Sequence, residues 1–143
     1  MIKKAIIITI ILNSLILIGV PDGHGYGIMA MFEFISIPYL IKNGFQINSE
    51  YPFEIGFIMI AVISLIGKMI LIVSLFYKKI SDKKPMIYFG LVLIILAFIG
   101  VVYSTIQYDS FLFAITFGSG IPFIMYFGRV IYLMNKKNIK VSD

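Results

Sequence analysis

The fold of this chain depends on residues 20–44, whose sequence is VPDGHGYGIMAMFEFISIPYLIKNG. The stretch is apolar enough to enter a lipid bilayer, yet it contains Asp22, His24 and Glu33 and is interrupted by Pro38. It can cross the membrane, lie on its surface, or enter it only part of the way. These arrangements give the whole chain different topologies, so the rest of the sequence has to decide between them.

The composition places the chain in a membrane. Its 143 residues are 60% hydrophobic and only 13% charged, whereas soluble domains average about 45–50% apolar and about 25% charged residues. A soluble fold of this length could not bury so much apolar surface, so a lipid environment is required. The chain has no cysteine and one histidine. This excludes disulfides, thiolate metal sites and metal sites built from several histidines of one chain.

Four apolar runs approach or exceed the ~20 residues that a helix needs to cross the hydrocarbon layer. The first resembles a signal peptide, but the residues that end it form a poor cleavage site, so we expect it to be retained as an anchor. The expected fold is an all-α integral membrane protein, a four-helix transmembrane bundle that forms a single domain over residues 1–143. The expected spans are about 5–20, 54–77, 86–107 and 111–134, with an outer segment 21–53, a cytoplasmic loop 78–85 and a cytoplasmic tail 135–143.

The distribution of basic residues favours four spans over five. If residues 26–41 do not cross, both termini are cytoplasmic, and every basic residue except Lys42 and Lys68 lies on or near the cytoplasmic side. A fifth span would place Lys3, Lys4 and Lys42 outside. Because cytoplasmic loops of membrane proteins carry an excess of lysine and arginine, the four-span layout is favoured. The expected location is a bacterial cytoplasmic (inner) membrane.

The quoted stretch also differs from a helix that lies on a membrane surface. Between Ile28 and Ile37 only Glu33 and Ser36 are polar, whereas an interfacial helix needs a broad polar face. Pro38 lacks a backbone N–H and is expected to end or kink the helix. We therefore expect a short outer, re-entrant helix between the first and second spans. A fifth span and a surface helix remain the alternatives.

Glu33, Lys68 and Asn13 form a candidate buried polar site. Lys68 lies near the middle of the second apolar run, where a lysine costs about 2.5–3.5 kcal/mol. Helical side chains lean toward the helix N-terminus, which here points Lys68 toward the outer half, where Glu33 is expected. An ion pair or a substrate contact is one interpretation, and a lysine that snorkels to the cytoplasmic surface is the other. For Glu33 a structural salt link is favoured over proton coupling.

Two glycine-containing segments are further candidates. In PDGHGYG (21–27), Asp22 and His24 could contact a ligand or cation in the outer loop, although a flexible turn is the plainer interpretation. In FGSGIP (117–122), Pro122 frees a carbonyl and Gly118 and Gly120 loosen the same turn. This predicts a kinked or partly unwound helix. Such breaks line ion sites in transporters, but in most membrane proteins they only set geometry.

The sequence contains no combination of nucleophile and base and no metal-binding constellation, so we expect no enzymatic activity and no cofactor. The leading expectation is a small polytopic membrane protein that acts by protein or lipid contacts, as an accessory or assembly subunit or as an immunity-type protein that binds a partner. Its expected partners are the lipid bilayer and a protein partner or further copies of itself, and not nucleic acid. The alternative is a small oligomeric channel or transporter that uses Glu33, Lys68 and the Gly118–Pro122 break.

Overall fold

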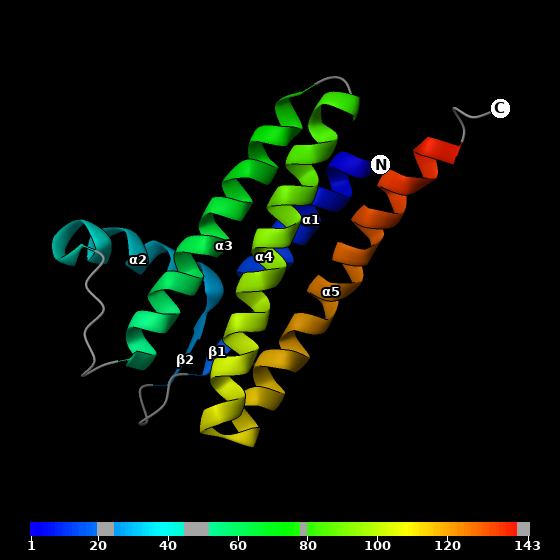
Figure 1. Ribbon diagram of the computed structural model, residues 1–143. Helices are drawn as coiled ribbons and strands as arrows, with labels where there is room; N and C mark the ends of the chain where they lie inside the picture. The colour runs from blue at the N-terminus through cyan, green and yellow to red at the C-terminus, as the bar shows by residue number, and fades with distance from the viewer. Residues whose placement is uncertain (20–24, 45–51, 78–79, 140–143) are drawn as a thin grey trace.

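The computed structural model describes residues 1–19, 25–44, 52–77 and 80–139. These residues form helices and one short two-stranded sheet (Figure 1). In chain order the elements are α1 (Ile2–Ser14), β1 (Leu17–Gly19), β2 (Tyr26–Ile28), α2 (Met29–Asn43), α3 (Pro52–Phe76), α4 (Ile80–Tyr108) and α5 (Ser110–Ile139).

The expectation of an all-α chain suited to a membrane is confirmed. Within the described ranges, three helices contain segments long and apolar enough to cross a bilayer. Many large apolar side chains on them point outward, such as Met125 on α5, which is 69% exposed. In water such exposure would be costly, but in hydrocarbon it is the expected outer surface. The three segments are Gly56–Phe76 of α3, Lys83–Tyr108 of α4 and Ser110–Lys136 of α5.

The first apolar run does not form a fourth full-length helix, so the expected helical span 5–20 is wrong in its extent. α1 ends at Ser14, and its 13 residues rise only about 20 Å, less than the ~30 Å of hydrocarbon. The chain continues as β1, which pairs antiparallel with β2. The Leu17 N–H also donates a hydrogen bond to Ser119 Oγ of α5 at 2.9 Å. These contacts satisfy the backbone after the helix has ended.

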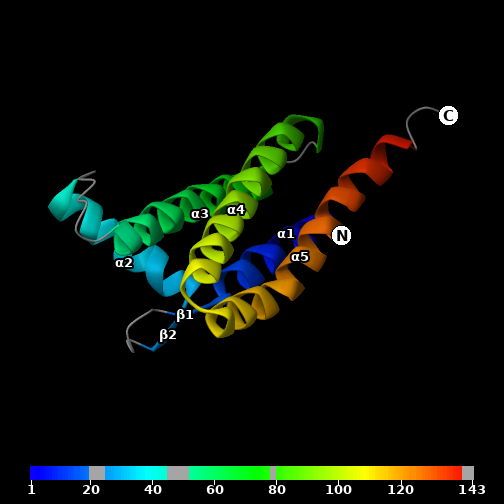
Figure 2. The same cartoon turned by 60° about the horizontal axis from the view of Figure 1, so that its bottom comes forward.

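The closest helix pair is α3 and α4, which lie side by side in both views (Figures 1 and 2). Gly67 of α3 faces Gly90 of α4, and a Cβ atom built on either glycine would lie 3.0 Å from the backbone oxygen of the other. Membrane helices approach closely where both present small residues. This pair therefore forms the central contact of the bundle, and α5 packs on the other side of α4 through Phe98 and Phe123.

α4 and α5 extend beyond the expected spans 86–107 and 111–134, which lie within the apolar segments Lys83–Tyr108 and Ser110–Lys136. α4 begins at Ile80 and contains Pro85, so the expected loop 78–85 is mostly helical. α5 continues to Ile139, past the expected start of the tail at residue 135. At the opposite end the chain turns at Asp109, whose N–H donates to Thr105 O and whose carbonyl accepts from Phe113 N–H.

α2 crosses α3 and leaves the bundle sideways, as Figures 1 and 2 both show. Pro38 was expected to end or kink this helix; it lies inside it, so the first alternative is wrong and the second stays a prediction. The helix ends instead at Gly44, which adopts a positive φ of 64° and donates its N–H to Leu40 O at 2.8 Å. Glycine reaches this conformation without the strain that a side chain would add.

Candidate functional site

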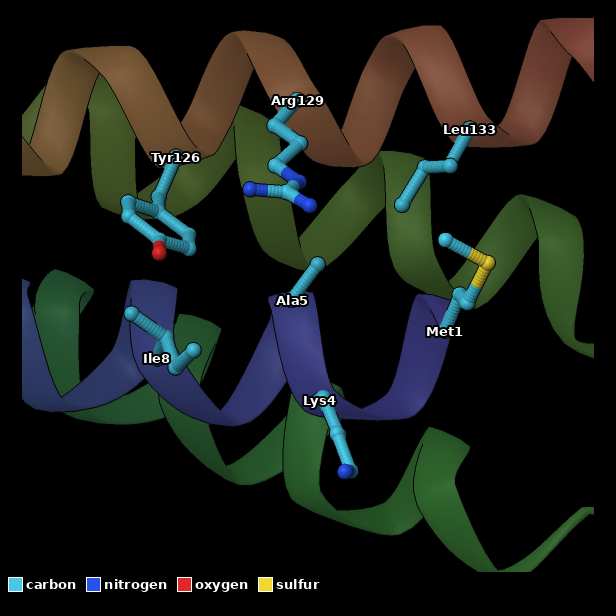
Figure 3. A pocket seen from close by; sticks show the side chains of 7 residues that line it. All are labelled: Met1, Lys4, Ala5, Ile8, Tyr126, Arg129 and Leu133. Atoms are coloured by element: carbon cyan, nitrogen blue, oxygen red, sulfur yellow. The ribbon is translucent and has the colours of Figure 1, made fainter.

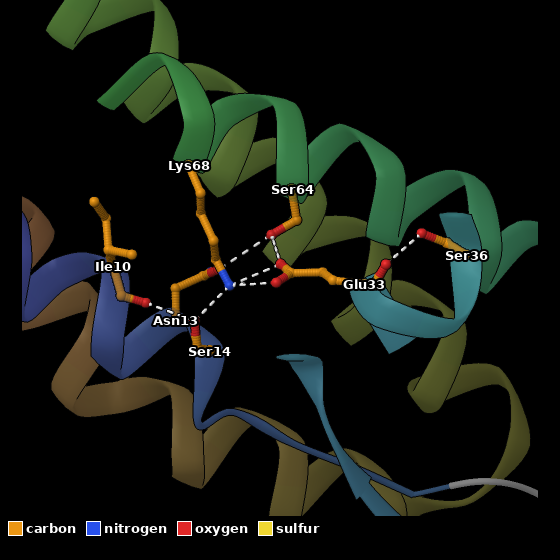
Figure 4. Close-up of polar contacts among 7 residues, drawn as sticks. All are labelled: Ile10, Asn13, Ser14, Glu33, Ser36, Ser64 and Lys68. Carbon is orange, nitrogen blue, oxygen red and sulfur yellow. Dashed lines mark hydrogen bonds and ion pairs between the residues drawn. The ribbon is translucent and has the colours of Figure 1, made fainter. Parts of the chain in front are cut away.

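A cluster of polar side chains, all buried except the half-buried Ser14, lies where α1, α2 and α3 meet (Figure 4). Each helix contributes two residues, and the cluster joins parts of the chain that are far apart in sequence. We call it the polar cluster; it consists of Asn13 and Ser14 of α1, Glu33 and Ser36 of α2, and Ser64 and Lys68 of α3.

An ion pair occupies the centre of the polar cluster. Lys68 Nζ lies 2.7 Å from Glu33 Oε1, and the two side chains are only 5% and 7% exposed. Lys68 Nζ also donates to Glu33 Oε2 at 2.8 Å and to Ser14 Oγ at 2.7 Å. An ammonium group has three N–H donors, so these three oxygens match its full donor capacity.

Serine hydroxyls complete the surroundings of the carboxylate. Ser64 and Lys68 are four residues apart and therefore lie on the same face of α3. Ser64 Oγ donates to Glu33 Oε1 at 2.6 Å and lies 3.1 Å from Asn13 Oδ1. Ser36 Oγ donates to the backbone carbonyl of Glu33 at 2.7 Å. A buried charge is tolerated when it is both paired and hydrogen-bonded, and the carboxylate of Glu33 meets both conditions.

The structure brings together the three residues that the sequence singled out for a buried site, Glu33, Lys68 and Asn13. The alternative in which Lys68 snorkels to the membrane surface is wrong, because its ammonium is buried against Glu33. The function of the site remains a prediction. The contributions of Ser14 and Ser64 were missed. The spacing of Ser64 four residues before Lys68 was the signal that could have identified it.

One polar atom of the cluster has no partner. Asn13 Nδ2 is buried and makes no hydrogen bond within the described residues, although Asn13 Oδ1 meets Ser64. A buried amide without a partner costs about 1–3 kcal/mol. The cluster therefore stabilises its charges fully, but leaves one donor beside them unused.

The other candidate residues do not join this cluster. Asp22 and His24 lie outside the described residues. A kinked or partly unwound helix was expected at Gly118, Gly120 and Pro122. α5 is helical from Ser110 to Ile139, so the helix is not unwound there, and the kink stays a prediction. Transmembrane helices tolerate proline when neighbouring groups compensate for the lost bond. Gly120 packs tightly against Phe98 of α4, whereas a Cβ on Gly118 would meet open space.

Comparison with known proteins adds no assignment to the polar cluster. No protein-family model, no curated protein and no solved structure matches this chain. Among the described residues, no three histidine, cysteine, aspartate or glutamate side chains lie together as a possible metal site. The chemistry of the polar cluster therefore follows from its own geometry, in which two opposite charges neutralise each other inside the bundle.

Proposed function

We propose that this protein acts in the membrane through contacts with a protein partner or with lipids, as an accessory or assembly subunit or as an immunity-type protein. The observation that supports this is the placement of α2. The Glu33–Lys68 ion pair attaches this helix to α3, and its apolar side chains face outward. The exposed ones are Met31, Phe34, Ile35, Ile37 and Ile41.

The outer side of α2 is more apolar than the outer side of a helix on a soluble protein. Its buried side holds the polar Glu33 and Ser36 beside the apolar Met29, while Phe34 and Ile41 on its outer side are 77% and 82% exposed. A helix of 15 residues is about 22 Å long and is too short to cross the bilayer alone. Its outer surface is suited to contact with a transmembrane helix of a partner or with acyl chains.

The proposed topology has four crossings, with both termini on the cytoplasmic side of a bacterial inner membrane. The start of α1, the start of α4 and the end of α5 lie at the same end of the bundle (Figure 1). This end carries Lys3, Lys4, Lys84 and Lys136, as the positive-inside rule requires of a cytoplasmic face. In this proposal α1 and β1 together make the first crossing.

The experiment is to extract the protein in a mild detergent, measure the mass of the complex and identify the molecules that copurify. We expect a mass above that of the monomer, and we expect Phe34→Asn on α2 to reduce it. Met125→Asn is the matched control, because Met125 is also exposed and apolar but lies on α5. A monomer free of protein and specific lipid, or an equal effect of both substitutions, contradicts the proposal.

A small oligomeric channel or transporter is the second candidate. It is supported by two ionisable side chains, Glu33 and Lys68, which are buried against α3, a helix long enough to cross the membrane. The unused donor Asn13 Nδ2 belongs to the same cluster. Ionisable residues within a membrane commonly mark ion or proton pathways. The test is proton flux into proteoliposomes containing a pH-sensitive dye. Flux that Glu33→Gln abolishes supports this candidate, and flux no greater than in protein-free liposomes rejects it.

A further inference from the structure

A pocket of about 230 Å³ lies between α1 and α5, apart from the polar cluster (Figure 3). Its α1 wall includes Met1, Ala5 and Ile8, and its α5 wall includes Tyr126, Arg129 and Leu133. No sequence pattern groups these residues, because they come from opposite ends of the chain. The pocket is therefore a product of the way α1 packs against α5.

Lys4 also lines the pocket, but its side chain points away from Arg129 (Figure 3). Two other groups in this pocket attract anions. The Arg129 side chain extends from α5 toward Ala5 of α1 (Figure 3), and its guanidinium carbon lies 5.6 Å from the centre of the Tyr126 ring. A guanidinium binds a phosphate through two parallel hydrogen bonds. The second group is the start of α1, where the cap residue Met1 makes no side-chain capping hydrogen bond. The N–H groups of a first helical turn lack partners within the helix and favour negative charge.

The position of the pocket along α5 matches the level of the lipid headgroups if α5 crosses the membrane from Asp109. From Ser110 to Arg129 a helix rises about 28 Å, close to the ~30 Å thickness of the hydrocarbon layer. If the turn at Asp109 lies at one membrane surface, Arg129 lies at the other. Ala5, Ile8 and Leu133 then give the pocket an apolar lining beside the guanidinium.

We propose that this pocket binds an anionic phospholipid, with the phosphate at Arg129 and the first part of the lipid tail against Ala5 and Ile8. Basic pockets between transmembrane helices on the cytoplasmic side are suited to anionic headgroups. The apolar lining favours a lipid over a free phosphate ion, because a hydrated ion gains nothing from contact with Ile8 or Leu133. This inference does not rest on the proposed role of α2, but it rests on the proposed topology, in which α1 and β1 make the first crossing and the basic end of the bundle faces the cytoplasm.

The test measures lipid binding to the purified full chain in mild detergent by native mass spectrometry. Phosphatidylglycerol, phosphatidylcholine and inorganic phosphate are titrated separately. We expect phosphatidylglycerol to bind more tightly than phosphatidylcholine, because the choline cation would be repelled by Arg129. Arg129→Gln should weaken phosphatidylglycerol binding about tenfold or more, the usual effect of losing a hydrogen bond to a charged group.

Two further variants separate the pocket from general attraction by positive charge. Lys136→Gln removes another exposed charge of α5 outside the pocket lining and should leave binding unchanged. Ala5→Leu keeps every charge but fills the pocket, and should weaken binding as Arg129→Gln does. Equal binding of the two lipids, or an Arg129→Gln variant that binds as tightly as the natural chain, overturns the proposal. Inorganic phosphate that binds as tightly as phosphatidylglycerol would identify a free-anion site instead and would also overturn it.

Discussion

Lys68 Nζ and Glu33 Oε1 lie 2.7 Å apart in the interior of the protein, although 35 positions separate the two residues in the sequence. The contact joins α3, a helix long enough to cross the membrane, to α2, which is not. Because both charges are nearly inaccessible, neither can be solvated when the other is removed. The ion pair therefore determines where α2 can lie relative to the bundle.

The first prediction concerns the coupling between these two residues. Glu33→Gln or Lys68→Met alone should lower the melting temperature in detergent, because each leaves one buried charge unpaired. Breaking a buried pair in this way typically costs about 3–5 kcal/mol. The double variant should recover part of the loss, since no unpaired charge remains. Melting is followed by circular dichroism.

The control for this cycle is Lys42→Met, which removes an exposed lysine in the last turn of α2. It should leave the melting temperature nearly unchanged. Losses from Glu33→Gln and Lys68→Met that simply add in the double variant would show that the two side chains are not coupled.

The candidate pair was predictable from the sequence because the physical constraint on it is local and strong. A lone lysine in an apolar run needs a partner, and the lean of helical side chains pointed Lys68 toward the segment that contains Glu33. Asn13 was a further candidate for this site because it is a polar residue within the first apolar run. The serines were harder to predict, since their hydroxyls also bond to nearby carbonyls, as Ser14 does to Ile10.

The end of α1 was not predictable because distant contacts decide it. Nothing in the apolar run before Val20 indicates that the helix ends at Ser14. The extended conformation of β1 is held by the bond from Leu17 N–H to Ser119 Oγ. Gly19 in addition lies so close to Leu112 of α5 that a Cβ would collide with that side chain. Both contacts are with a helix about 100 residues later in the chain, beyond the reach of local patterns.

The second prediction concerns the close contact between α3 and α4. Gly90→Ala should destabilise the protein by about 1–3 kcal/mol, the usual cost of overpacking, because the new methyl group would lie 2.8 Å from Leu71 Cγ. Gly128→Ala is the matched control, since a Cβ there meets nothing within 4 Å, and alanine at an open helical position is favourable by about 0.5–1 kcal/mol. Thermal unfolding in detergent measures both. Equal stabilities of the two variants would argue against close packing at Gly90.

The third prediction compares two glycines in the same turn of α5. Gly120→Ala should lower the melting temperature because its methyl group would collide with the Phe98 ring. Gly118→Ala should be neutral or stabilising, because the space around it is open. If these glycines instead existed to loosen the helix before Pro122, both substitutions would have similar effects. The measurement is again thermal unfolding, with the two variants prepared in the same detergent.

The fourth prediction concerns Asp109, which connects α4 to α5. Asp109 Oδ1 accepts a hydrogen bond from Phe111 N–H at 3.2 Å, as an N-cap residue does. Asp109→Ala should cost about 0.5–2 kcal/mol of stability, whereas Asp109→Asn should retain most of it, because asparagine caps a helix equally well. A loss in Asp109→Asn as large as that in Asp109→Ala would show that the charge, and not the cap, matters.

The last prediction tests the topology through reporter fusions. The basic end of the bundle contains the start of α1, the start of α4 and the end of α5 (Figure 1). If this end faces the cytoplasm, fusions after residues 82 and 140 report a cytoplasmic location. A fusion after residue 45 reports an outer location, because α2 then lies in the outer half. A second variant adds two lysines after residue 45. It should weaken or invert the pattern of fusion locations, since positive charge at residue 45 opposes an orientation that places this residue outside. An outer location at residue 82 in the natural chain would contradict the four-crossing arrangement and would place the Arg129 pocket at the outer surface.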